Sequence, residues 1–228
     1  MKLLLFLAAG ACALAQIEQP QIGVMLDENG AARAVLGVAG STTVSDPLWS
    51  GVLSLACSAQ VCFAKTPTSL VSSSGDAIDA PAGPAIFAID GASAYVYFPK
   101  TRQLVRWHDG QLELIETAPG GEVLAVRATR GEFEYAMRRA DGVRAGNRYL
   151  GDAAAVLLLG EGTVLIADGE QVRLLRSDGA EADFPVAGVQ SFIRISDAYV
   201  QLVTSSGMWA LAIEPGQERL FLLPGGSR

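Results

Sequence analysis

The single histidine is the first residue to consider for chemistry. His108 is followed directly by Asp109, and a His-Asp pair would suit a Ser-His-Asp triad. The chain has no G-x-S-x-G elbow to supply the serine, and the side chains of sequence neighbours point apart. We therefore interpret His108 as a polar turn residue and predict no catalytic residue.

The sequence also offers little to hold a metal or a cofactor. Residues 27–30, Asp-Glu-Asn-Gly, begin like a calcium loop, but the EF-hand spacing stops there, so we interpret them as a turn. Residues 160–162, Gly-Glu-Gly, lack the following helix that a phosphate cradle needs. We predict no metal site and no cofactor.

Paired carboxylates and tryptophans leave one enzymatic or carbohydrate-binding alternative open. Glycoside cleavage needs two carboxyl groups roughly 5–10 Å apart, and Glu132 and Glu134 share one side of a predicted strand. Their alternation is more typical of an exposed outer strand, which favours a non-catalytic protein. Trp49 and Trp107 lie near predicted loops and are our candidate ligand contacts, whereas we expect Trp209 to pack in the core.

Two cysteines have the spacing of a hairpin pair. Cys57 and Cys62 are separated by four residues and would lie on facing strands. In an oxidising compartment they could form a cross-strand disulfide, and otherwise they are two small buried hydrophobic residues. Because the loop is short, such a bond would add little stability beyond the hairpin itself.

The N-terminus has the pattern of a secretory signal peptide over residues 1–15. A minimal basic start, an apolar run over 3–11 and the small-x-small residues 13–15 predict cleavage before Gln16. The alternative is a lipoprotein signal at Cys12, which lacks the expected Leu three residues earlier. No stretch is long and apolar enough to predict a membrane span. We therefore predict a secreted or periplasmic protein.

Composition indicates a globular, acidic chain. Hydrophobic residues make up 50% and charged residues 18%, and the formal net charge is −7, which disfavours nucleic acid and anionic lipid as partners. One local basic cluster, interpreted as solvated strand faces and turns, consists of Arg130, Arg138, Arg139, Arg144 and Arg148.

Four short predicted strands recur along the chain. Residues 85–117 contain strands at 85–89, 94–98, 103–107 and 111–117, separated by Gly, Pro-Lys-Thr and Asp-Gly turns. First strands that match in position recur every 33 to 37 residues, at Leu53, Ile86, Val123, Val156 and Phe192. First strands are nearly all apolar and later ones alternate, as inner and outer strands of a blade would.

The predicted fold is all-β, a β-propeller-like array of about five four-stranded blades plus an N-terminal hairpin. The repeats cover 51–225, and 16–50 would hold the hairpin, with strands at 22–26 and 32–38, and a loop over 39–51. The hairpin could seal the ring, or belong to a sixth blade. The same strands could also form an open ring or a β-sandwich.

The stretches AYVYFPKTRQLVRWHDGQ and TVLIADGEQVRLLRSDG resemble blades of secreted bacterial β-propellers of the NHL and YVTN-like group. The resemblance covers about 51–225. It is one of general strand and turn pattern without a diagnostic motif, because the Gly-His and Trp-Asp markers of WD40 blades and the sialidase Asp-box are missing. It implies a toroid with a central channel and binding at the channel face or on loops.

These features predict a non-catalytic binding module in the cell envelope with a protein partner. The alternative is a carbohydrate-binding protein or a glycoside-active enzyme that uses paired carboxylates with Trp49 or Trp107. A purely structural envelope component is a third hypothesis.

Overall fold

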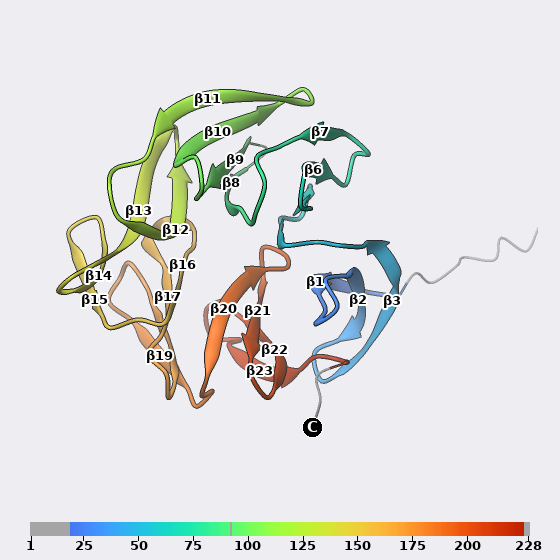
Figure 1. Ribbon diagram of the computed structural model, residues 1–228. Coiled ribbons are helices and arrows are strands. Elements are labelled where there is room, and N and C mark those ends of the chain that lie inside the picture. The colour runs from blue at the N-terminus through green and yellow to red at the C-terminus, as the bar shows by residue number, and fades with distance from the viewer. Residues whose placement is uncertain (1–18, 92, 226–228) are drawn as a thin grey trace, which may run out of the picture.

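The computed structural model describes residues 19–91 and 93–225 as a six-bladed β-propeller (Figure 1). The fold is all-β, with a single short 3₁₀ turn, η1 (Gly160–Gly162), in the described residues. The predicted signal peptide and Cys12 lie outside these residues. No helix among the described residues is long and apolar enough to cross a membrane.

Five blades have four antiparallel strands each, and the first has three. Blade 1 consists of β1 (Gln21–Leu26), β2 (Ala32–Val38) and β3 (Ser41–Trp49). Blades 2 and 3 consist of β4 (Ser54–Cys57), β5 (Cys62–Lys65), β6 (Ser69–Ser72) and β7 (Ala77–Asp79), then β8 (Ile86–Asp90), β9 (Ser93–Phe98), β10 (Gln103–His108) and β11 (Gln111–Thr117). Blades 4 and 5 consist of β12 (Glu122–Thr129), β13 (Glu132–Arg139), β14 (Gly142–Ala145) and β15 (Arg148–Gly151), then β16 (Ala155–Leu158), β17 (Val164–Ala167), β18 (Val172–Leu175) and β19 (Glu181–Phe184). Blade 6 consists of β20 (Val189–Arg194), β21 (Tyr199–Thr204), β22 (Gly207–Ala212) and β23 (Arg219–Leu222).

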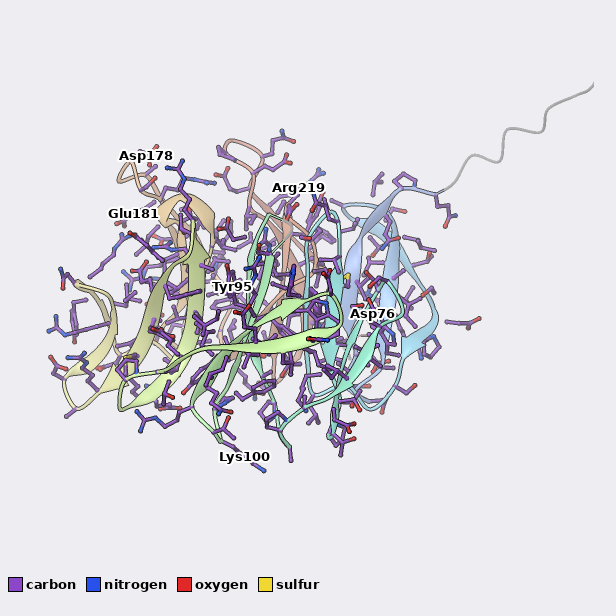
Figure 2. All side chains as sticks on the ribbon, turned by 90° about the horizontal axis from the view of Figure 1, so that it is seen from above. Asp76, Tyr95, Lys100, Asp178, Glu181 and Arg219 are labelled. Atoms are coloured by element: carbon purple, nitrogen blue, oxygen red, sulfur yellow. A yellow bond between two sulfur atoms is a disulfide. The ribbon has the colours of Figure 1, made fainter. Side chains whose placement is uncertain are left out.

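Each blade is a simple meander in which neighbouring strands of the sheet are also consecutive in the chain. The inner strands β4, β8, β12, β16 and β20 surround the axis, and apolar side chains pack between blades. Tyr95 of blade 3, for example, meets Phe133 of blade 4 edge-on with ring centroids 4.9 Å apart. Asp178 and Lys100, from turns that join different strand pairs, lie at opposite faces of the ring (Figure 2). We call these the Asp178 face, where the inner strands end, and the Lys100 face, where they begin.

The prediction of a loop over residues 39–51 was wrong, because β3 spans most of it and turns the predicted hairpin into a three-stranded sheet. This nine-residue strand is the outer edge of blade 1 and is largely exposed. The strand was not predicted because it lacks an apolar face and because Asp46 and Pro47 are residue types typical of turns. Pro47 is accepted because an outer edge strand need not donate every N–H to a ladder. The alternative of a sixth blade is therefore the one that the structure supports.

Blade 1 lacks an inner strand, because β1 occupies the position of a second strand. The Val24 N–H donates to the Ile195 carbonyl at 3.0 Å, just after β20. Two residues later, Leu26 is bonded to Gln201, which stands opposite Ile193 in the blade 6 register. Moving forward along β1 therefore means moving back along β20, so β1 runs antiparallel to the inner strands.

Lys65 is the one buried charged residue among the described residues, with 0% of its surface exposed. Its Nζ donates to the Thr66 carbonyl, and burial lowers the pKa of the amine. Between the lowered pKa of the folded state and the ordinary value of about 10.4, the unfolded chain therefore binds more protons than the folded one, so the free energy of unfolding should rise with pH across that window.

Lys65→Met should raise the free energy of unfolding at pH 7 by about 1 kcal/mol, because it removes the desolvated amine and keeps the volume. Urea unfolding at pH 7 and pH 9.5 would check this. We expect the variant to lose most of the pH slope that wild type shows between these values. A less stable variant would mean that the bond to Thr66 outweighs desolvation.

Candidate functional site

The described chain encloses a central cavity with a volume of about 770 Å³. The five inner strands, the end of β1 with the turn after it, and the β21–β22 turn form its wall. Most lining side chains are aliphatic, and the aromatic ones are Phe87 and Phe192. A cavity of this size that combines apolar side chains with polar groups is typical of a ligand-binding site.

At the Asp178 face, Arg194 narrows the cavity. Its Nη1 donates to the Ile89 carbonyl at 3.3 Å, although β20 and β8 are separated by β4. The same guanidinium is paired with Asp197, whose other oxygen accepts the Ala59 N–H at 3.0 Å. One arginine and one aspartate thus connect blade 6 with blades 2 and 3.

Similar polar links join the other blades on this face. Arg127 is paired with Glu134 and donates to the Leu159 carbonyl of the next blade at 2.9 Å. Asp90 accepts the Arg130 N–H at 2.8 Å, and Arg176 donates to the Ile213 carbonyl at 3.0 Å. These contacts connect neighbouring blades at the Asp178 face. At the Lys100 face the cavity is lined by the exposed residues Glu28, Leu53 and Ser191, so we take that face as the entrance of the cavity.

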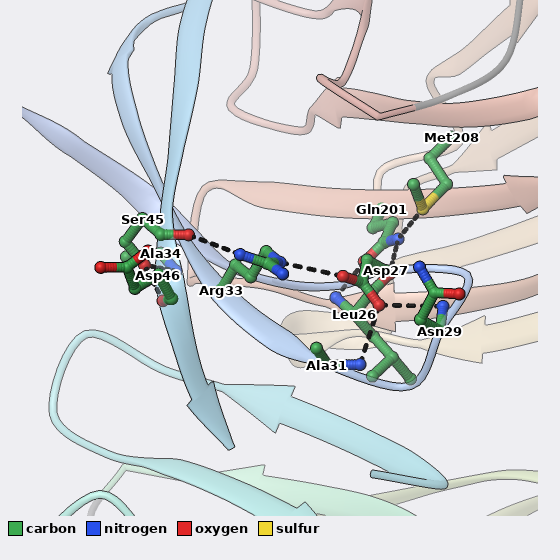
Figure 3. A network of polar contacts seen from close by, with 10 residues as sticks. All are labelled: Leu26, Asp27, Asn29, Ala31, Arg33, Ala34, Ser45, Asp46, Gln201 and Met208. Carbon is green, nitrogen blue, oxygen red and sulfur yellow. Dashed lines mark hydrogen bonds and ion pairs between the residues drawn. The ribbon is translucent and has the colours of Figure 1, made fainter. Parts of the chain in front are cut away.

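The β1–β2 turn stands at this entrance and is held by Asp27 (Figure 3). Its carboxylate accepts the N–H groups of Asn29 and Ala31 at 2.9 and 2.8 Å and is paired with Arg33 at 2.9 Å. Burial by itself would raise the pKa of Asp27, but these three partners together lower it below its ordinary value. Asp27 is therefore ionised at neutral pH and is a structural anchor rather than a proton donor.

Beside Asp27, the tip of the same turn carries Glu28, which is exposed and lines the cavity. The turn rests on the segment that leads into β4, because the Gly30 carbonyl accepts the Val52 N–H at 2.8 Å. The next residue, Leu53, also lines the cavity and is 44% exposed. A carboxylate without an ion-pair partner among the described residues and an exposed aliphatic side chain thus both line the entrance.

The structure does not bring the two candidate tryptophans together. Trp49 lines a second hollow of about 400 Å³ between blades 1 and 2, beside Leu48 and Cys62. Trp107 belongs to the apolar cluster between blades 2 and 3, where it packs edge-on against Phe63 with ring centroids 5.5 Å apart. Neither tryptophan lines the central cavity.

The other residues considered for chemistry lie mainly on the surface. His108 ends β10, and its Nε2 lies 3.4 Å from the Asp109 carboxylate in an exposed turn, so the expectation that these two side chains point apart was wrong. Glu132 is exposed, whereas Glu134 is paired with Arg127. Within the basic cluster, Arg138 is paired with Glu122 and Arg144 with Asp141.

In the structure a disulfide joins Cys57 and Cys62, which face each other across β4 and β5. We predict that the folded chain shows no thiol at these positions until it is reduced, as alkylation of the unfolded protein and mass spectrometry would reveal. The Cys57→Ala, Cys62→Ala double variant should lose at most about 2 kcal/mol, because the closed loop is short. Alkylation of both cysteines without reductant would contradict the bond.

Sequence reasoning missed Arg127, Arg194 and Gln201. Each is a polar residue in or at the end of a strand, with an apolar residue directly before and after it in the sequence. That interruption is the signal that could have identified them, since burying a polar side chain is costly unless it has partners.

No family model matches the chain, and neither does any curated protein. Solved β-propellers resemble it in fold. One chain of the nidogen/laminin complex is 10% identical with a TM-score of 0.61, and the match covers 90% of this chain and 95% of that one. PorZ of Porphyromonas gingivalis is 12% identical with a TM-score of 0.53 over 91% of this chain, which spans only 38% of that protein's chain. BBS1N in complex with ARL6DN is 12% identical with a TM-score of 0.50 over 90% of this chain and 80% of that one. At such identities the likeness shows the fold alone, so the protein is a β-propeller by architecture.

Proposed function

We propose that this protein is a non-catalytic binding module, secreted or periplasmic, that takes apolar side chains of a protein partner into its central cavity. The observation that carries the proposal is the cavity itself, with its aliphatic wall and the exposed Leu53 at the entrance. Two of the compared propellers come from complexes with a protein partner, which supports this choice by analogy of fold.

The carbohydrate alternative has less support. Sugar rings stack on exposed aromatic faces, and Trp49 in the second hollow is the one candidate tryptophan placed to offer such a face. In the central cavity, Asp27 is ionised and paired with Arg33, so it does not act as the protonated acid that glycoside cleavage requires.

Site-specific photo-cross-linking in the native host tests the proposal. A photoreactive residue would replace Leu53 at the entrance or, as a control, Leu222 on the outer strand β23, which is 38% exposed. We expect one reproducible protein adduct from position 53 and none from position 222. Adducts from position 222 alone, or none from either, would overturn uptake in the cavity. Retention on a polysaccharide column that is lost in Trp49→Ala would favour the carbohydrate alternative instead.

A further inference from the structure

The charges around the cavity are not balanced. Both guanidinium groups in its wall are neutralised, Arg127 by Glu134 and Arg194 by Asp197. At the entrance, Arg33 neutralises Asp27 in the same way.

Two carboxylates of the cavity wall have no cationic side chain as a partner among the described residues. Glu28 at the Lys100 face and Asp90 at the Asp178 face form no ion pair with any residue in 19–91 or 93–225. Asp90 accepts the backbone N–H of Arg130, which is an uncharged donor. The uncompensated charge of the cavity is therefore negative at both ends.

Glu28 is also held where a ligand must pass. The bonds from Asp27 to the N–H groups of Asn29 and Ala31 fix the turn, and Gly30 docks it on Val52. The backbone that carries Glu28 is therefore fixed at the rim of the cavity, which exposed Leu53 also lines. The chain as a whole carries a net charge of −7, which adds to the attraction for a cationic ligand.

We propose that the segment bound by the cavity is apolar and flanked by Lys or Arg, with Glu28 as the residue that selects this flank. The inference rests on the proposed function, because it specifies the chemistry of the partner at the same site. Apolar side chains enter the aliphatic interior, and the basic flank stays at the entrance beside Glu28. An acidic flank is repelled at the same place.

Three synthetic peptides with blocked ends test this proposal by calorimetry on the mature chain. Their sequences are Lys-Leu-Phe-Leu-Lys, Gln-Leu-Phe-Leu-Gln and Glu-Leu-Phe-Leu-Glu. We expect the basic peptide to bind roughly five-fold more tightly than the neutral one at low salt, and the acidic peptide to bind most weakly. The preference should shrink at high salt because the groups are exposed.

Variants at the entrance distinguish selection of the peptide's charge by Glu28 from uptake of its apolar side chains by the cavity. Glu28→Gln should remove most of the preference, and Glu28→Lys should reverse it between the basic and acidic peptides. The matched control Glu181→Lys changes an exposed glutamate on β19, away from the cavity, and should leave the preference unchanged. Ser191→Trp, which fills part of the entrance, should weaken binding of all three peptides.

The outcomes distinguish this inference from the function on which it rests. Equal binding of the three peptides, still weakened by Ser191→Trp, would overturn selection by Glu28 and leave cavity uptake standing. A preference for the basic peptide that persists in Glu28→Gln would overturn the role of Glu28. If no peptide binds, the inference fails, and the cross-link from position 53 decides separately whether a protein partner exists.

Discussion

Gln201→Met is expected to lower the free energy of unfolding by about 3 kcal/mol, although it keeps the volume of the side chain. Gln201 is fully buried, and its amide is bonded to both backbone groups of Leu26, accepting from the N–H at 3.0 Å and donating to the C=O at 2.7 Å (Figure 3). A peptide group of an inner strand would make the same two bonds. The variant leaves both groups of Leu26 without a partner, at about 1–3 kcal/mol for each.

Urea unfolding of wild type and variant, followed by tryptophan fluorescence, would measure this loss. Gln217→Met is the matched control, because Gln217 is exposed in the turn before β23 and its side chain makes no hydrogen bond to the described residues. The control should change stability by less than about 0.5 kcal/mol. A loss of similar size in both variants would mean that the Gln201 amide does not seal the ring.

The blades could be predicted from the sequence because the patterns that indicate their strands and turns lie within a few neighbouring residues. Residues 111–117 were predicted as a strand and form β11 with the same bounds, since alternation and the Asp-Gly turn before it determine both its register and its start. The strand predicted at 85–89 is β8, shifted by one residue. Buried first strands such as β16 could be identified by their continuous apolar runs.

The closure of the ring and the candidate site could not be predicted in the same way. The Gln201–Leu26 contact joins residues 175 positions apart, and no periodicity in the chain encodes it. Glu28 looked like an ordinary turn residue, and only the antiparallel run of β1 brings it to the cavity entrance. The same contacts therefore close the ring and position the residue to which we assign partner selection.

Gly23→Ala should lower the free energy of unfolding at least as much as Gln201→Met. It disrupts the other contact between β1 and blade 6, the one between Gly23 and Ile195. A Cβ at position 23 would lie 2.1 Å from the Ile195 carbonyl oxygen and 2.7 Å from its carbon. Both are backbone atoms, so no side-chain rotation relieves the overlap. The strands must separate, and the bond from the Val24 N–H to the same oxygen breaks with them. We expect a loss of roughly 3 kcal/mol or more, or failure to accumulate as folded protein.

Gly120→Ala is the control for Gly23→Ala, since a Cβ there meets only the Arg102 side chain at 3.8 Å. Thermal unfolding of the two variants should separate them clearly, with the control close to wild type. If the ring closes through the contact between β1 and Ile195, Gly23→Ala should also displace the β1–β2 turn that carries Glu28. The purified variant should then lose peptide binding under conditions where its blades are still folded by circular dichroism. A Gly23→Ala protein as stable as wild type would show that β1 does not pack against Ile195, and both the closure of the ring and the placement of Glu28 would have to be abandoned.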